Sequence, residues 1–597
     1  LMNERVQALK ASPLPRAVSR PSLLPDAIYW KVKAERAMGG SSAVTREQWS
    51  KDLDLAVLSL ARNKAALDDE GSRLGLIGKE KNLFHLAIDV AYEQWERDTS
   101  SANLDHLLNL TEADRSILLK SRLNDFSGMR FAGMPDSILT REGQLIDALE
   151  IDPEDPASTQ DLDKREQALA DFLTRLSKDH PQYFALRYGE PHVSIADLRK
   201  RLVTPEQNLL AYAVTGEHLY MLVVRMDKAT LVRTSNKGLA STVKAMNDAV
   251  AARDAAQYIR SAHALHQLAF APVAHLLPQQ RLLIIPDGEL HRVNFEALID
   301  APCTPTDFRK HLLIQRHAIA YLLSATTAVQ FAGLAGERSS KVLAMAPGFA
   351  DELKQDYLAR MEDTTLVDRD FLNYVRQPFA VTTANQLGSL LSAKVMVGNE
   401  ASEAGFRELA GKYGVLHLGT HAEMNATTPM YSRLVLSKDG RGVDADNDGY
   451  LHAYEIYELD LRAELAVLTA CQTGAGKDDD GEGVRSLGYG FAYAGCPSLV
   501  VALWSIDEKV SSEIITRFYE LLADGMPKHE ALRQAKLDHL AMASEELALP
   551  YYWAGMVLVG DVEPIKVGPS GWAFVWWGLA GLGACIIGFL VWRRKRQ

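Results

Sequence analysis

Two short segments, VLHLGTH at residues 415–421 and LAVLTACQTG at residues 465–474, decide the predicted fold of this chain. Each reads as a short apolar strand that runs into one reactive side chain, His421 in the first and Cys471 in the second. In an open parallel sheet, functional groups collect beyond the carboxyl ends of the strands. If the two strands are neighbours, an imidazole lies beside a thiol, which is the minimum apparatus of a cysteine hydrolase.

The surrounding sequence indicates a mainly parallel sheet with helices on its faces. From residue 204 onwards apolar runs of strand length alternate with helical stretches, a pattern typical of α/β layering. The strand candidates are NLLAYAV, HLYMLVVRM, RLLIIPD, KVLAMAP, GVLHLGT, ELAVLTA and SLVVALW. These are enough strands for two units, and we expect a silent half over 204–338 and a catalytic half over 339–565. The first half lacks a His/Cys pair at its strand ends.

The N-terminal part of the chain has a helical pattern. Residues 47–126 contain amphipathic stretches with apolar residues three and four apart, and they are similar in length and pairing to TPR-like helical hairpins. We therefore expect a helical TPR-like region over 1–126 and a helical linker region over 127–203. Two roles remain open for the TPR-like region: it binds a peptide or a protein partner, or it packs on the catalytic part.

Several motifs, taken together and in this order, resemble one known family. They are TPEQNLLAYAVTGEHLYMLVV (204–224), LLIIPDGELHRVNFEALI (282–299), HLGTHA (417–422), LTACQTG (468–474), GYGFAYAGCPSLVVALWSIDE (488–508) and YYWAGMVLVGD (551–561). The family is CHAT, caspase-like cysteine proteases often found behind TPR-type helical repeats, with caspases, separase and gingipains as wider relatives. The resemblance covers roughly 130–565. It implies a caspase-like α/β fold, made of a pseudo-caspase half and an active half, behind an all-α region.

The resemblance also implies roles for individual residues. His421 would be the general base and Cys471 the nucleophile, and the backbone N–H groups of Cys471 and Ala422 would form the oxyanion hole. Ala422 stands where many relatives have glycine, a change that matters only if the position needs a positive φ. A second histidine, His417, lies inside the same strand, and we favour a packing role for it.

The segment WSIDE at 504–508 resembles the part of the family that lines the substrate cleft. Asp507 and Glu508 would then accept a basic side chain of the substrate. Alternatively, Ser505 or Asp507 would cap the helical stretch that follows. We favour this N-cap role, and the two roles are compatible.

Between the two strand motifs lies DADNDGYLHAYE at 444–455, which has the complete pattern of an EF-hand-type loop. Hard carboxylate oxygens, a glycine at the sharp turn and a closing glutamate are what Ca²⁺ requires. The expected ligands are Asp444, Asp446, Asp448, the carbonyl of Tyr450, His452 through a water, and Glu455. Since a strand precedes the loop, it would be an isolated calcium loop rather than a paired EF-hand. An ordinary Asp/Gly-rich turn is the alternative.

The position of the loop suggests a hypothesis about regulation. Calcium bound at 444–455 would order the chain between His421 and Cys471 and thereby set the geometry of the site. The alternative is an ion that is always bound and only structural.

The C-terminus predicts a membrane anchor. Residues 571–592 carry no charge, have tryptophans towards both ends and are followed by the basic tail 593–597, as expected of a transmembrane helix. The positive-inside rule then places the tail in the cytoplasm and the catalytic part outside it.

Composition narrows the remaining choices. The net charge of −12 argues against a nucleic-acid partner, which would need clustered basic residues. The four cysteines, Cys303, Cys471, Cys496 and Cys585, are too few for a disulfide framework. The sequence therefore predicts a membrane-anchored, caspase-like cysteine endopeptidase that acts on proteins and is activated or stabilised by calcium. The alternative is a calcium-responsive, membrane-tethered scaffold without catalysis.

Overall fold

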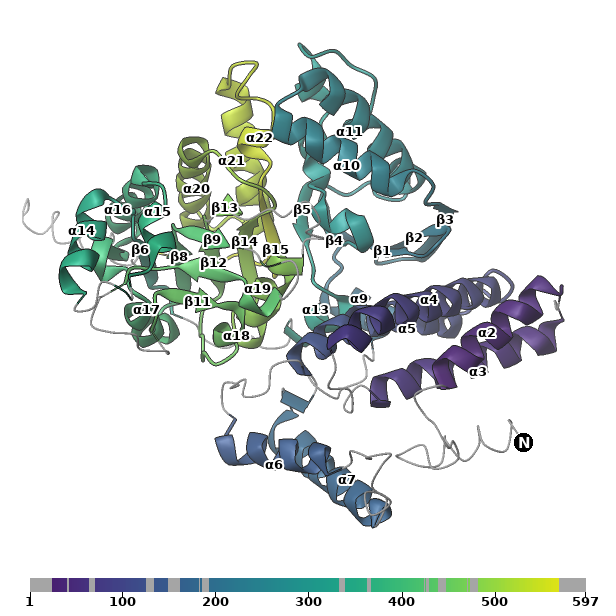
Figure 1. The fold of residues 1–597 in the computed structure, drawn as a ribbon. Coiled ribbons are helices and arrows are strands. Elements are labelled where there is room, and N and C mark those ends of the chain that lie inside the picture. Colours follow the sequence, from purple (N-terminus) through teal and green to yellow (C-terminus); the bar gives the residue numbers. More distant parts are fainter. Residues whose placement is uncertain are drawn as a thin grey trace, which may run out of the picture.

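The fold is described from a computed structural model of the chain. It describes residues 24–39, 42–63, 70–124, 134–148, 161–181, 183–184, 193–331, 339–361, 365, 367–423, 425, 429–438, 447–469, 471–472 and 482–567. The order of elements is a helical region, a first group of strands and a second group of strands (Figure 1).

The N-terminal region consists of helices. They are α2 (Leu24–Ala37), α3 (Ala43–Asn63), α4 (Glu70–Trp95), α5 (Ser101–Asn124), α6 (Asp136–Asp147), α7 (Leu162–Asp179) and α9 (Ile195–Arg201). Each of α2, α3 and α4 packs on the next helix along the chain, as the helices of TPR-like hairpins do. Buried residues recur every three to four positions, for example Leu53, Ala56 and Leu60 on α3, so an apolar stripe faces the neighbouring helices. This arrangement is consistent with the predicted TPR-like character.

The strands of the main sheet come from both halves of the α/β region. They are β1 (Gln207–Val214), β2 (His218–Val224), β3 (Ala229–Ser235), β4 (Arg281–Ile285), β5 (Ala318–Tyr321), β6 (Val342–Ala346), β7 (Lys394–Val397), β8 (Val415–Leu418), β12 (Leu465–Leu468), β14 (Ser498–Ala502) and β15 (Met556–Gly560). Among the described residues they form an eleven-stranded sheet in the order β3-β2-β1-β4-β5-β15-β14-β12-β8-β6-β7. Only the pairs β1–β2, β2–β3 and β14–β15 within this sheet are antiparallel, which confirms a mainly parallel sheet.

One pairing joins the two halves into a single sheet. β15, the last strand in the sequence, runs parallel to β5 of the first half and antiparallel to β14 of the second. The central strands are buried along their length, as expected when helices cover both faces of a parallel sheet.

The helices that follow the strands cover both faces of the sheet. They are α10 (Leu239–Ala252), α11 (Ala255–Ala269), α12 (Ala271–Ala274), α13 (Ala325–Phe331), α14 (Asp351–Arg360), α15 (Arg369–Asn373), α16 (Pro378–Leu391), α17 (Glu403–Leu409), α18 (Ala453–Ile456), α19 (Glu482–Tyr493), α20 (Glu508–Ala523), α21 (Lys528–Met542) and α22 (Pro550–Trp553). In the second half, α16, α20 and α21 lie on one side of the sheet and α17, α18 and α19 on the other (Figure 1).

A second, four-stranded sheet lies beyond the carboxyl ends of β8 and β12. Its strands are β9 (His421–Glu423), β10 (Arg433–Val435), β11 (Tyr450–His452) and β13 (Cys471–Gln472), in the order β11-β10-β9-β13. The strand predicted before the calcium loop is β10. The small sheet therefore contains both predicted dyad residues and part of the predicted calcium loop.

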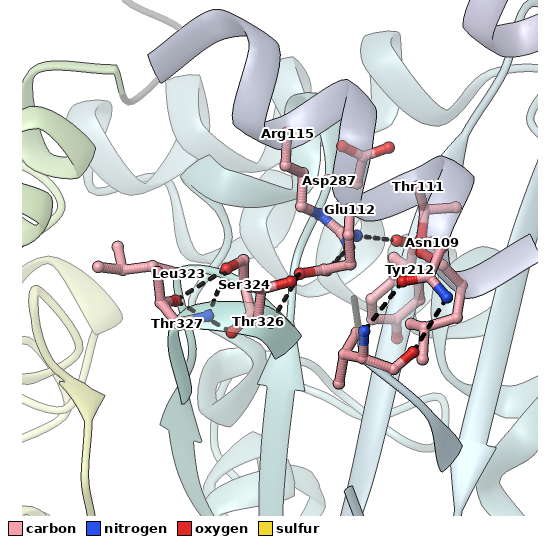
Figure 2. Close-up of polar contacts among 12 residues, drawn as sticks. Asn109, Thr111, Glu112, Arg115, Tyr212, Asp287, Leu323, Ser324, Thr326 and Thr327 are labelled. Carbon is pink, nitrogen blue, oxygen red and sulfur yellow. Dashed lines mark hydrogen bonds and ion pairs between the residues drawn. The ribbon is translucent and has the colours of Figure 1, made fainter. Parts of the chain in front are cut away.

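Helix α5 docks on the first half through a buried ion pair (Figure 2). The side chains of Glu112 and Arg115 are 1% and 3% exposed and lie 2.7 Å apart. Glu112 also accepts hydrogen bonds of 2.8 Å from the backbone N–H and the hydroxyl of Thr326, in the first turn of α13. Arg115 donates to the carbonyl of Tyr212 on β1. The helical region therefore packs on the α/β region, which is one of the two roles left open by its sequence.

The predicted membrane anchor has to be corrected. Among the described residues no helix is long and apolar enough to cross a bilayer. The longest described helix, α4 with 26 residues, has charged residues along its length, whereas a membrane span needs about 20 mostly apolar residues. The predicted span 571–592 and tail 593–597 lie outside the described residues. The fold class is therefore corrected to a helical region followed by a mainly parallel α/β region, and a single-pass membrane localisation is not supported.

The docking of α5 predicts a large effect of one substitution. Glu112→Ala leaves the guanidinium of Arg115 buried without its carboxylate, so we expect the free energy of unfolding to fall by about 3–5 kcal/mol. Denaturant unfolding of the full chain measures this loss. The double variant Glu112→Leu/Arg115→Leu, which removes both charges, should recover part of the stability. An unchanged unfolding midpoint for Glu112→Ala would contradict the role of this ion pair.

Candidate functional site

The backbone brings the two predicted dyad residues to facing positions. β8 and β12 run parallel, with His417 opposite Val467 and Leu418 opposite Leu468. The connection from β8 to β9 has the same length as the connection from β12 to β13. The register of the β8–β12 pair is therefore kept in the β9–β13 pair. His421 is consequently opposite Cys471 in a parallel pair, where strands lie about 4.8 Å apart.

A hydrogen bond fixes the orientation of the His421 ring. The imidazole is buried, and its Nε2 lies 2.8 Å from the carbonyl oxygen of Val375. Because a carbonyl oxygen only accepts, Nε2 carries the proton, and Nδ1 of the neutral ring has a free lone pair. Nδ1 has no hydrogen-bond partner in the part of the chain that the structure describes. Nδ1 is therefore the atom able to accept a proton.

Aromatic rings enclose the imidazole of His421. Tyr374 stacks on it with ring centroids 5.1 Å apart, and Phe349 packs at 4.9 Å in a tilted arrangement. Burial lowers the pKa of His421 below its ordinary value, and the positive charge of Lys354 acts in the same direction. The hydrogen bond to the Val375 carbonyl opposes this shift. The imidazole is thus neutral at pH 7, as a general base must be.

Two polar contacts hold the ring of Tyr374 against the imidazole. Its hydroxyl donates to Glu423 on β9, two residues after His421. Glu423 also pairs with Arg433 on β10, at 2.7 Å. The stacked tyrosine is therefore tied to the same small sheet that contains the histidine.

Sequence reasoning missed the residues that surround His421. Tyr374 and Val375 lie in the connection between α15 and α16, and a backbone carbonyl has no residue-type signal. Phe349 follows β6 and has a φ of 46°, which is rare for a bulky residue and characteristic of functional sites. The only clue was Pro347-Gly348 at the end of an apolar strand in the same parallel sheet.

The structure also shows what surrounds Ala422 and His417, the other two residues singled out in this segment. Ala422 lies within β9, opposite Leu434 on one side and Gln472 on the other, and its φ is not positive. Alanine is therefore tolerated at this position, while its oxyanion role stays a prediction. His417 is fully buried, with Nδ1 3.4 Å from the hydroxyl of Tyr519. Burial lowers the pKa of His417 to about 4, so it belongs to the core under α20.

Asp507 and Glu508 both act on helix N-termini. Asp507 is the N-cap of α20, and its Oδ1 accepts from the N–H of Val510 at 2.9 Å. Glu508 reaches across to α16, where its Oε1 accepts from two backbone N–H groups, those of Phe379 and Ala380. Burial raises the pKa of Glu508, and these two bonds oppose the rise. Their predicted contact with a substrate stays a prediction.

The described part of the predicted calcium loop, residues 447–455, forms a tight turn that leads into a short strand. Gly449 has a φ of 87°, which the sharp turn requires, and the short strand β11 follows at once. Helix α18 then begins at Ala453. Oδ1 of Asp448 accepts from the N–H of Tyr450 at 2.8 Å, which stabilises the turn.

The ligand atoms of the loop fit calcium only in part. The carboxylate of Glu455 accepts from the N–H of His452 and pairs with Arg407 at 2.7 Å. Burial raises the pKa of Glu455 to about 8. Asp444 and Asp446 lie outside the described residues. Within those residues, no group of three or more His, Cys, Asp or Glu side chains is arranged to hold a metal ion.

Comparisons with known proteins identify the family of the α/β region. A model of the CHAT domain matches residues 260–561, about half of the chain, which confirms the resemblance seen in the sequence. No curated protein matches the chain. Solved structures that are similar include the Saccharomyces cerevisiae separase–securin complex, with a TM-score of 0.43 and 9% identity. That match covers 91% of this chain, and this chain spans 40% of the length of that chain.

The environment of His421 predicts its titration. In a Cys471→Ala variant, nuclear magnetic resonance should find the His421 pKa below the ordinary value of about 6.5. Because the unfolded chain binds this proton more readily, protonation should also lower the free energy of unfolding as the pH falls below about 6.5. Adding Tyr374→Ala exposes the ring and should move the pKa back up. A His421 pKa at or above 6.5 in the first variant would contradict the description.

Proposed function

Because the chain belongs to the CHAT-domain family, we propose that it is a caspase-like cysteine endopeptidase with Cys471 as nucleophile and His421 as base. The observation that carries this proposal is the pairing of His421 with Cys471 across two parallel strands. The orientation of His421 supports it, since Nε2 is held by Val375 and Nδ1 is left to accept a proton.

The proposed reaction follows from this arrangement. Nδ1 of His421 takes the thiol proton of Cys471, and the thiolate attacks the carbonyl carbon of the scissile peptide bond. Backbone N–H groups of Ala422 and Cys471 stabilise the oxyanion that forms. The imidazolium then returns the proton to the leaving amine. Water hydrolyses the acyl-enzyme, with the same imidazole as base.

We also propose that Asp507 and Glu508 select a basic substrate side chain. Their capping bonds engage Oδ1 of Asp507 and Oε1 of Glu508. A carboxylate has a second oxygen, so capping and substrate binding are compatible. A protein partner on the helical region is a further proposal, and the packing of α5 restricts it to the faces of that region not covered by the α/β part.

A peptide-library assay tests the proposed protease. The full chain should cleave peptides, and Cys471→Ala and His421→Ala should each lower the rate by more than about 1000-fold. Cys303→Ser is the matched control, since Cys303 lies in a loop outside the site, and it should keep full activity. Cleavage that survives Cys471→Ala would contradict the proposed nucleophile. A folded protein without cleavage under any condition favours the scaffold alternative.

We further propose that calcium at 444–455 stabilises the dyad. The supporting observation is one row across the small sheet, in which Tyr450 is opposite Val435, Val435 is opposite His421, and His421 is opposite Cys471. Tyr450 is the residue whose carbonyl is expected to bind the ion. A change in the position of β11 therefore reaches the dyad through two hydrogen-bonded strand pairs.

The residues proposed to hold the ion supply oxygen ligands. They are Asp444, Asp446, Asp448, the carbonyl of Tyr450, His452 through a water, and Glu455. Bound there, calcium would neutralise the clustered carboxylates and fix the loop. Glu455 would have to exchange its pairing with Arg407 for the ion.

Calcium titrations test this second part of the proposal. Asp448→Asn and Glu455→Gln should each weaken calcium binding by about tenfold or more, because each removes a ligand charge. The control Asp460→Asn changes an exposed carboxylate outside the loop and should have no effect. Calorimetry on chelator-treated protein measures binding, and peptide cleavage measures activation. Activity that stays flat while binding saturates would show that the ion is only structural.

A further inference from the structure

The orientation of the His421 ring depends on the backbone carbonyl of Val375, and the side chain of Val375 is not packed in the core. The side chain of Val375 is 73% exposed, so its packing does little to hold the carbonyl that accepts from Nε2. Val375 lies in the short connection that leads into α16. The position of its carbonyl therefore depends on how the start of α16 is anchored.

The N-terminus of α16 is not capped by its own residues. Pro378 is the first residue of the helix, and the N-cap residue Gln377 makes no side-chain capping bond. The N–H groups of Phe379 and Ala380 belong to the first turn and have no intrahelical acceptor. Both donate instead to one oxygen of Glu508, at 2.8 and 3.0 Å.

Glu508 is the first residue of α20, the helix that follows strand β14. β14 is the parallel neighbour of β12, and the chain then leads through Asp507 into α20. Helices α16 and α20 pack on each other, and the hydroxyls of Thr383 and Ser512 lie 2.6 Å apart. Glu508 thus joins the N-terminus of α20 to the N-terminus of α16.

Neighbouring contacts fix the rest of the connection. The N–H of Gln377 donates to the carbonyl of Gly348 at 2.9 Å, and its side chain donates to the carbonyl of Thr420 at 3.3 Å. Lys354 donates to the carbonyl of Tyr374 at 2.6 Å. Val375 is therefore flanked by anchored residues, and Glu508 anchors the helix end of the connection.

We propose that Glu508 is a positioning residue for the dyad: its carboxylate fixes the N-terminus of α16, and through it the Val375 carbonyl that orients His421. This role is additional to any contact with a substrate. The inference rests on the proposed function only in naming His421 as the base. The contacts that define the positioning are independent of catalysis.

The test observes the His421 ring directly. In the Cys471→Ala protein with ¹⁵N-labelled histidine, the Nε2–H signal of His421 is assigned by its loss in His421→Gln. Glu508→Ala should remove or shift this signal, because the connection that contains Val375 loses its anchor at the helix end. Glu508→Gln keeps an oxygen acceptor and should retain the signal. Asp507→Ala is the matched control, since it uncaps α20 but leaves the α16 contacts in place.

Kinetics of the same substitutions in the active protein give a second readout. Glu508→Ala should lower kcat by about 10- to 100-fold, as loss of an orienting partner commonly does, whatever rise in KM the loss of a substrate contact adds. Glu508→Gln should recover most of kcat. A raised KM with unchanged kcat would assign Glu508 to substrate binding and overturn the positioning role.

The two proposals can fail separately. An unchanged His421 signal in folded Glu508→Ala, or an equal change in Asp507→Ala, would overturn the positioning role. If the unsubstituted protein cleaves no peptide but the signal still depends on Glu508, the positioning stands and the protease proposal fails. If Glu508→Ala does not fold, loss of the signal in folded Glu508→Gln would overturn the proposal, because that variant keeps the acceptor.

Discussion

The parallel register between the histidine strand and the cysteine strand is the constraint on which the rest of the site depends. β8 and β12 pair deep in the main sheet, and β9 and β13 continue the same register beyond it, so His421 faces Cys471. Because buried parallel strands leave little freedom to slip, this pairing is fixed by the core rather than by the site. The Val375 carbonyl and the aromatic rings then only need to orient one imidazole.

The four-stranded sheet connects segments that are distant in the sequence to the imidazole of His421. Its row from β11 to β13 connects the predicted calcium loop with the dyad, and β10 contributes Arg433 to the contact that holds Tyr374. From the other side, the connection that leads into α16 presents the Val375 carbonyl, and Glu508 ties α16 to α20. The His421 imidazole is thus surrounded by parts of the chain that have little in common in sequence. The helical region contacts the first half of the α/β region through α5.

The sequence predicted the features that leave a pattern of residue types along the chain, and it did not predict those that arise from tertiary contacts. Apolar runs of strand length predicted the strands that carry the dyad, and strand-end placement predicted that His421 and Cys471 would meet. Val375, Tyr374 and Phe349 escaped because a backbone carbonyl and ring packing depend on tertiary contacts between distant segments. Glu508 was singled out only for a substrate contact, whereas its carboxylate caps the N-terminus of α16. The fold class was right for the α/β and helical regions and needed correction for the membrane span.

The central claim is that the fold activates the thiol of Cys471. The most direct measurement is the rate of iodoacetamide labelling at neutral pH for each cysteine, read by mass spectrometry. Cys496 is buried, and burial raises the pKa of Cys303, so neither is expected to react quickly. We predict that Cys471 labels far faster than both, and that His421→Ala removes this difference. Labelling of Cys471 no faster than that of Cys303 would contradict the account.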